Sequence, residues 1–140
     1  METSGSTTAL DTLIPETCLA LIGKKHLGRL ALVIDGDIHV VLVNYVLQGN
    51  SILFRTASNT LLAEAAPCKV TLEVDDIDEG ARRGWSVSAK GICRDVADTA
   101  AAPQLATLDI DTWAPGSKPL LFEIAATELT GRHLYPNRNA

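Results

Sequence analysis

The clearest pattern in the sequence is a series of apolar segments separated by short turn signals. Residues 30–34 are apolar, 35–37 read Asp-Gly-Asp, and an apolar segment returns over 38–47. A Gln-Gly-Asn turn at 48–50 then leads into another apolar segment at 51–56. Because tight turns join strands that pair side by side, this region predicts a three-stranded antiparallel meander.

The second half of the chain continues the strand pattern with longer connections. Apolar and polar residues alternate over 69–74, a charged loop is predicted at 75–84, and a long strand bent at Gly91 follows. We expect that strand at 85–96 and the last strands at 120–124 and 129–135. The pattern predicts a mainly β fold, a six-stranded antiparallel barrel, because closure removes exposed strand edges.

Two or three short helices are expected between the strands. Pro suits a first helical position, Ser, Asn and Thr suit helix caps, and an Ala-rich segment favours helix. These signals predict helices from Pro15, over 61–66 and over 99–108. The polar segments 1–12 and 136–140 are predicted to be flexible tails. The remaining residues, 13–135, are then a single domain.

The amino-acid composition and net charge make some classes of function poor candidates. The chain has 140 residues with 12 Lys and Arg against 17 Asp and Glu, a net charge of −5. An acidic chain is a poor candidate for binding nucleic acid, although it leaves room for a local basic pocket. No apolar stretch is long enough to span a membrane, and the first residues lack a secretory signal pattern, so we expect a cytoplasmic protein. The widely spaced Cys18, Cys68 and Cys93 predict small buried thiols rather than disulfides.

Residues that could bind a ligand are clustered at the end of the third predicted strand. Arg55 and Thr56 are followed by Ser58, Asn59 and Thr60 at the predicted start of a helix. Guanidinium, hydroxyl and amide donors at one point suit a phosphate group. The alternative is that Ser58 or Asn59 only caps the helix while Arg55 faces solvent.

Two further pairs of residues each allow a structural and a ligand-binding interpretation. Asn44 and Tyr45 interrupt the most apolar strand, where a polar side chain either pairs with loop backbone or faces a ligand. Trp85 and Ser86 open the long strand after the charged loop. Trp85 is either a core anchor or, beside a hydroxyl, a platform for a flat heterocycle.

The remaining titratable residues do not form a recognised catalytic or metal-binding pattern. His26, His39 and His133 are scattered, and His39 is expected to be structural. The acidic run at 75–79 lacks the ligand spacing of a calcium loop and is expected to be a solvated surface. From the residues alone, the sequence predicts a small antiparallel barrel with one candidate anion pocket and no metal site.

Several stretches, taken together and in order, resemble the pyridoxamine 5′-phosphate oxidase-related family of FMN-binding split barrels, in particular its short actinobacterial-type members. The resemblance runs from about residue 16 to residue 134. Its motifs are Leu27-Gly28-Arg29-Leu30-Ala31, Val43-Asn44-Tyr45-Val46, Leu53-Phe54-Arg55-Thr56, Glu73-Val74-Asp75-Asp76-Ile77-Asp78, Gly84-Trp85-Ser86-Val87 with Gly91, Trp113-Ala114-Pro115-Gly116 and Leu129-Thr130-Gly131-Arg132.

The resemblance implies a six-stranded split barrel that forms a homodimer and binds FMN at the subunit interface. It implies that the strand carrying Val43, Asn44 and Tyr45 lies beside the isoalloxazine ring. It further implies that Arg55, Thr56 and the helix start at Ser58, Asn59 and Thr60 hold the phosphate, while Trp85 and Ser86 reach the polar edge of the ring. No catalytic residue is implied, because the cofactor itself performs the chemistry.

One position departs from the family pattern and keeps two functions open. Related sequences commonly carry Lys after the residue that matches Thr60, and here that position is Leu61. Loss of a charged hydrogen bond costs about 1.5–3 kcal/mol, so weaker FMN binding is predicted. The first interpretation is an FMN-dependent oxidoreductase that transfers hydride between a nicotinamide or deazaflavin donor and a small acceptor. The second is a non-enzymatic dimeric module that binds a flavin or another small ligand.

Overall fold

The fold is a closed antiparallel sheet with two short α-helices, seen in a computed structural model that describes residues 8–99, 105 and 108–137. The strands are β1 (Thr8–Leu13), β2 (Leu27–Ile34), β3 (Asp37–Gln48), β4 (Ser51–Thr56), β5 (Cys68–Asp78), β6 (Arg83–Asp95) and β7 (Leu120–Pro136). The helices are α1 (Pro15–Ile22), α2 (Leu61–Ala65) and the 3₁₀ turn η1 (Val96–Asp98). The predicted helix at 99–108 lies largely outside the described residues.

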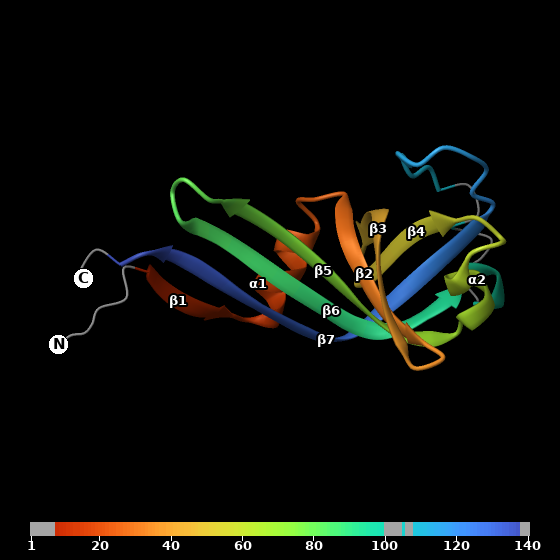
Figure 1. Cartoon of the computed structure of the whole chain (residues 1–140), viewed down its shortest axis with the longest axis horizontal. Coiled ribbons are helices and arrows are strands. Elements are labelled where there is room, and N and C mark those ends of the chain that lie inside the picture. The colour runs from red at the N-terminus through yellow and green to blue at the C-terminus, as the bar shows by residue number, and fades with distance from the viewer. Residues whose placement is uncertain (1–7, 100–104, 106–107, 138–140) are drawn as a thin grey trace.

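Strand pairing follows the order β1-β7-β4-β3-β2-β5-β6, and a further pairing of β6 with β7 closes the ring. All pairs are antiparallel, and the predicted meander corresponds to β2, β3 and β4. Figure 1 shows the strands wrapping around one another, with both termini at the opposite end of the molecule from α2. The mainly β barrel predicted from the sequence is confirmed, with seven strands in the described residues instead of six.

Three of the sequence-based boundaries were wrong. Residues 8–12 were expected in a flexible tail, but they belong to β1, which pairs with the end of β7 as far as Pro136. The predicted strands at 120–124 and 129–135 are one continuous strand. The expected loop at 75–84 is mostly a hairpin arm, in which Asp75 to Asp78 pair with β6. In each case a neighbouring strand supplies hydrogen-bond partners that the local sequence does not reveal.

The barrel interior is filled by aliphatic side chains and one aromatic pair. The rings of Phe54 and Phe122 meet edge to face, with centroids 6.0 Å apart. Cys18 and Cys93 are fully buried among these apolar residues, and burial raises the pKa of the Cys93 thiol to about 12. The predicted role as small buried thiols agrees with the structure for Cys18 and Cys93, whereas Cys68, also a free thiol, is only half-buried at the edge of the core.

Tyr45 fixes α1 to the barrel. Its side chain is 1% exposed, and its hydroxyl donates to the Ile22 carbonyl oxygen at 2.6 Å, at the last residue of α1. The ring therefore belongs to the core, and burial raises the pKa of the phenol well above its usual value.

The Tyr45→Phe variant is expected to lose about 0.5–1.5 kcal/mol of unfolding free energy, because the Ile22 carbonyl loses the hydroxyl and keeps only the Lys25 backbone N–H at 3.2 Å. Urea unfolding measures this difference. Tyr135→Phe is a suitable control, because the Tyr135 hydroxyl donates to Asp11 at an exposed site and its loss should change stability little. Equal stability of Tyr45→Phe and wild type would contradict this role for the hydroxyl.

The barrel is split because β3 changes its neighbour along its length. Residues 37–44 pair with β2, whereas residues 45–48 pair with β4. On the other side of the split, Arg55 and Thr56 at the end of β4 pair with β7 rather than with β3. The two strands therefore diverge beyond the Tyr45–Phe54 pair and leave a space between them.

Within the described part of the chain, none of the helices is long and apolar enough to cross a lipid bilayer.

Candidate functional site

A cavity of about 390 Å³ occupies the space where β3 and β4 diverge. Its size lies within the range of small-molecule sites, near the lower end. α2 and the segment that leads into β7 complete the wall, and Figure 1 shows both beyond the end of β4. Most of the wall is apolar; its polar and charged residues are His39, Asn44, Arg55, Thr56, Thr60, Thr112 and Lys118.

The residues that line this cavity carry positive charge, whereas the net charge of the protein is negative. Arg55 and Lys118 both line the cavity, and no Asp or Glu is among the lining residues. The chain as a whole carries a net charge of −5. Two cations in a largely apolar cavity attract an anion, because the surrounding low-dielectric wall focuses their field. The cavity is therefore suited to a ligand with an anionic group and an apolar body.

Arg55 is half-buried and fixed in the cavity wall. It lies at the end of β4, and its Nη2 donates to the Leu108 carbonyl oxygen at 2.9 Å. This bond orients the guanidinium plane before any ligand arrives, which lowers the entropy lost on binding. The solvent-facing alternative considered for Arg55 does not describe its position.

The hydroxyls beside Arg55 form a short chain that also caps α2. Thr60 Oγ1 accepts from the Ala63 backbone N–H at 3.2 Å and donates to the Ala57 carbonyl at 3.1 Å. Thr56 Oγ1 lies 3.1 Å from Thr60 Oγ1. Because the Thr60 proton is already used, Thr56 is the donor in this contact, and it can turn its proton toward an anion only by giving up the bond to Thr60. Thr60 is thus the helix cap, a role that the sequence had suggested for Ser58 or Asn59.

Asn44 presents an unpaired donor to the cavity. Its Oδ1 accepts from the Trp113 backbone N–H at 2.8 Å, which ties β3 to the segment before β7. Its Nδ2 is buried and has no hydrogen-bond partner among the described residues. A buried amide without a partner costs free energy, so this atom is well placed to meet an acceptor on a ligand. The backbone-pairing interpretation therefore holds for Asn44 Oδ1, and the ligand-binding interpretation stays a prediction that concerns its Nδ2.

The structure brings only part of the predicted site together. Val43, Asn44, Arg55, Thr56 and Thr60 line the cavity. Ser58, Asn59, Tyr45, Trp85 and Ser86 do not.

The reasons why these residues lie elsewhere differ. Ser58 and Asn59 are exposed in the turn before α2, and the Tyr45 side chain is in the core. Trp85 is half-buried and packs against the main core cluster, as the core-anchor interpretation expected. Ser86 lies in a separate shallow hollow with Arg132. Within one chain, β6 therefore contributes nothing to the cavity.

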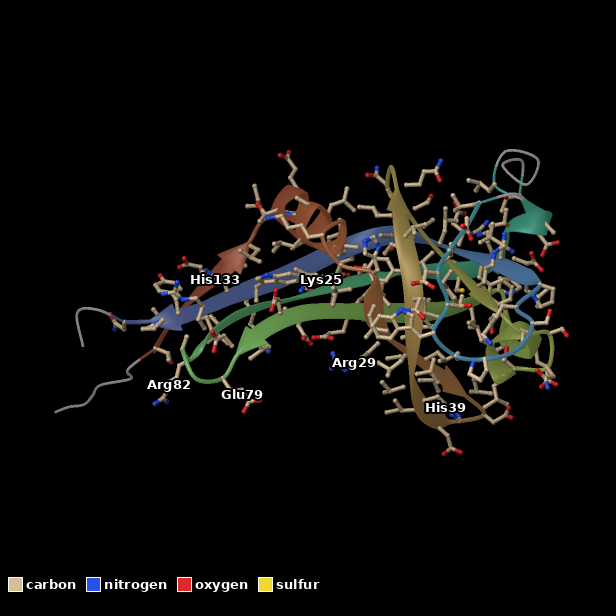
Figure 2. All side chains as sticks on the ribbon, turned by 90° about the horizontal axis from the view of Figure 1, so that it is seen from above. Lys25, Arg29, His39, Glu79, Arg82 and His133 are labelled. Carbon is tan, nitrogen blue, oxygen red and sulfur yellow. The ribbon has the colours of Figure 1, made fainter. Side chains whose placement is uncertain are left out.

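Three polar or charged lining residues were missed by the sequence analysis: His39, Thr112 and Lys118. Lys118 lies far from Arg55 in sequence, and only the path of the chain across the split brings the two together. His39 was expected to be structural, yet it lies on β3 near the β2–β3 turn, where its alternation with Ile38 and Val40 places it on the cavity face (Figure 2). The Trp113-Ala114-Pro115-Gly116 motif was the only sequence signal for this segment.

A second charged cluster lies on β2 and β5, outside the cavity. Arg29 Nη1 contacts Glu73 Oε1 at 3.1 Å and Asp75 Oδ2 at 2.8 Å, and Lys25 pairs with Asp76 at 2.9 Å. Figure 2 shows Arg29 on β2 and Lys25 nearby, after α1. Burial, together with the neighbouring Asp75, raises the pKa of Glu73 to about 6, although Arg29 opposes the shift.

The Glu73→Gln variant is expected to be more stable than wild type at pH 7. The pKa of Glu73 is higher in the folded protein than its ordinary value of 4.5, so folding favours the protonated carboxyl. Its contribution to the unfolding free energy is complete below pH 4.5 and is lost as the pH rises through about 6. The difference in stability between wild type and variant should therefore grow across this window. No difference between pH 4.5 and 7 would contradict the shift.

Urea unfolding at several pH values measures this effect. Glu79→Gln is the matched control, because Glu79 is exposed at the β5–β6 turn (Figure 2). We expect its unfolding free energy to track that of wild type at every pH.

In the described residues, no group of three or more His, Cys, Asp or Glu side chains is arranged to hold a metal ion.

The sequence profile of the pyridoxamine 5′-phosphate oxidase family matches residues 15–137, which is most of the chain. The fold, the cavity in the split and this match define the class of protein. The chain belongs to the pyridoxamine 5′-phosphate oxidase family. No curated protein sequence matches it.

Several solved structures are similar over nearly the whole chain. The FAD-binding protein from Mycobacterium smegmatis is 31% identical with a TM-score of 0.73, and the match covers 90% of this chain and 98% of that one. A conserved protein of unknown function from Corynebacterium diphtheriae is also 31% identical, with a TM-score of 0.72 over 88% of this chain and 96% of that one. A FAD-binding protein from Mesorhizobium loti shares the fold at 21% identity, with a TM-score of 0.73 and coverage of 91% and 98%.

Proposed function

We propose that this protein is an FMN-binding oxidoreductase that transfers hydride between a nicotinamide or deazaflavin donor and a small acceptor. The observation that carries the proposal is the cavity between β3 and β4, which combines apolar walls, two cations and an unpaired buried donor without any carboxylate. These features match the three parts of a flavin mononucleotide: a flat ring, acceptor atoms on the ring and a phosphate.

The residues present fit this cofactor. The Arg55 guanidinium is suited to meet two phosphate oxygens with parallel N–H donors, and the Thr56 hydroxyl lies beside it. The Asn44 Nδ2 supplies a donor for an acceptor on the ring. Val43, on the same strand, provides apolar contact area.

A bound flavin supplies the hydride chemistry itself. The protein then binds, orients and shields the reacting atoms. The apolar walls limit access of water, which protects a reduced flavin from side reactions. No acid–base pair of side chains is required in this role, in keeping with a cavity that lacks carboxylates.

A homodimer is the second part of the proposal. Apolar side chains on β2 and β3 are exposed, with Ile38 at 77% and Leu42 at 65%. Val33, which pairs with Ile38, and Val40 are exposed on the same face, whereas the exposed Val41 lies on the opposite face of β3. Val41 and Leu42 also line the cavity, so a second copy seated here would lie next to the cavity. A contiguous exposed apolar patch is typical of a subunit interface. Light scattering gives the molar mass that tests this, and a monomer would oppose it.

We further propose a cytoplasmic location, which the three free cysteines support, because free thiols persist in reducing compartments.

The uncharged side chain of Leu61 supports a second candidate function, that of a non-enzymatic ligand-binding module. This residue lines the cavity, is 51% exposed and brings no charge to the anion site. A cavity that holds its ligand weakly suits a non-enzymatic dimeric module that stores or carries a flavin or a similar anionic ligand. Both functions use the same cavity and differ in whether the bound flavin is reduced and reoxidised.

The test of the proposed function is anaerobic reduction of the FMN-loaded protein. Protein with bound FMN is mixed with NADH, with NADPH or with a reduced deazaflavin, and the visible flavin absorption is followed by stopped flow. The oxidoreductase proposal predicts bleaching with one of these donors at a rate well above that of free FMN. Bleaching no faster than for free FMN with all three would support the non-enzymatic module.

A further inference from the structure

The cavity holds a second cation that the FMN proposal has so far left without a role. Lys118 lies in the segment just before β7 and is half-buried in the cavity wall. Its Nζ donates to the Pro115 carbonyl oxygen at 3.0 Å. The chain turns back at Gly116, where φ is +102°, a conformation that favours glycine. This turn folds Lys118 back onto its own segment.

The ammonium of Lys118 has no carboxylate partner. The ion pairs among the described residues join Lys25 or Arg29 to β5, and none involves Lys118. Its one recorded partner is a neutral backbone carbonyl at an exposed site. An ammonium has three donors, so it can keep this bond and still meet an anion. Lys118 is therefore an uncompensated positive charge beside the proposed phosphate site.

Lys118 and Arg55 reach the cavity from different elements. Arg55 comes from the end of β4, where its guanidinium is anchored to the Leu108 carbonyl, whereas Lys118 comes from the segment that enters β7. A phosphate monoester carries close to two negative charges at neutral pH. Arg55, whose guanidinium is fixed, and Lys118, whose ammonium lies on a flexible stem, together supply two positive charges that match the charge of the phosphate.

We propose that Lys118 is the second counter-charge for the flavin phosphate, so that the cavity selects a phosphorylated flavin over riboflavin. This inference rests on the proposed FMN function and adds a residue that determines specificity. Riboflavin presents the same ring and side chain without the phosphate. Lys118 should therefore contribute binding free energy for FMN but not for riboflavin.

The test compares FMN and riboflavin binding to Lys118→Met, measured by quenching of flavin fluorescence. Met keeps most of the length of the side chain and removes only the charge. We expect the Kd for FMN to rise about 10- to 100-fold, as loss of one charged hydrogen bond predicts. The Kd for riboflavin should stay within about twofold of wild type. Added salt should weaken FMN binding less in the variant than in wild type.

Two further variants sharpen the result. Lys69→Met removes the same charge from an exposed position on β5 outside the cavity, and it should leave both Kd values within about twofold. Leu61→Lys in the Lys118→Met background places an ammonium on another side of the same cavity. This double variant should recover most of the FMN affinity, because the phosphate responds to charge rather than to a particular backbone position.

Three other outcomes would overturn the inference, and the binding data distinguish their causes. If wild type binds FMN tightly and Lys118→Met binds it within threefold, Lys118 has no such role while the proposed function stands. If the variant loses FMN and riboflavin equally, Lys118 shapes the cavity rather than recognising phosphate. If wild type binds neither flavin, the proposed function itself fails and the inference fails with it.

Discussion

The Arg55→Ala variant is expected to bind FMN at least tenfold more weakly than wild type. Among the described residues, Arg55 is the one guanidinium that lines the cavity, and the bond to the Leu108 carbonyl fixes it at the end of β4. A bidentate contact between guanidinium and phosphate is among the strongest hydrogen-bonding arrangements that side chains offer. Its loss should cost about 1.5–3 kcal/mol of binding free energy. Fluorescence titration with FMN measures the change.

Two controls separate phosphate recognition from a general effect on the fold. Arg94→Ala removes an exposed guanidinium from β6, outside the cavity, and should bind FMN like wild type. Arg55→Lys retains the charge but loses the planar fork, so an intermediate affinity is expected. Unchanged FMN affinity in Arg55→Ala would place the phosphate elsewhere, whatever the riboflavin result.

The Gly91→Val variant is expected to prevent formation of the native barrel. β6 has an irregular register between Lys90 and Gly91, where it passes close to β7. A Cβ at Gly91 would overlap the Ala125 carbonyl oxygen and lie 3.2 Å from the Ala126 Cα, both backbone atoms. Backbone in paired strands cannot move aside as a side-chain tip can, so the smaller Gly91→Ala change should already cost more than about 2 kcal/mol.

Urea unfolding of Gly91→Ala and the far-ultraviolet circular dichroism of Gly91→Val test this expectation. Gly80→Ala is the matched control, since a Cβ there meets only the Asp78 side chain at an ordinary 3.6 Å. The control should stay within about 0.5 kcal/mol of wild type. Wild-type stability in Gly91→Ala would mean that β6 and β7 are further apart than the structure places them.

The local parts of the fold followed from the sequence, because local signals decide them. The Asp-Gly turn after Ile34 and the Gly-Asn turn after Gln48 fix a meander by themselves, and the structure pairs β2, β3 and β4 in that way. A helix beginning at Pro15 and a bend at Gly91 also followed from residue type. These features depend on backbone preferences of single residues.

Features that depend on distant partners were not predictable from local pattern. Residues 8–12 mix polar residues with Ala9 and Leu10 and carry no clear strand pattern, yet they form a strand because the end of β7 offers them an edge to pair with. The charged residues after Val74 are extended for the same reason, since β6 pairs with them. Burial by a partner strand, rather than intrinsic propensity, decides such segments.

The same distinction between local and distant signals explains which residues of the candidate site were predicted and which were missed. Arg55 and Thr56 were identified because they are adjacent in sequence at the end of a strand. Lys118 was missed because nothing in its local sequence relates it to Arg55. Relatives commonly carry Lys where this chain has Leu61, and in this structure a cation lines the cavity from the segment before β7, as Lys118.

The most direct test of the central claim, that the split between β3 and β4 is a flavin phosphate site, is a titration of the purified full-length protein with FMN followed by flavin fluorescence. We predict saturable binding with a Kd of about 1 μM or tighter, equivalent to about −8 kcal/mol. Inorganic pyrophosphate should compete with FMN, because it occupies the same pair of cations. Absence of binding at FMN concentrations of about 1 mM, where any affinity beyond about −4 kcal/mol would register, would contradict the account.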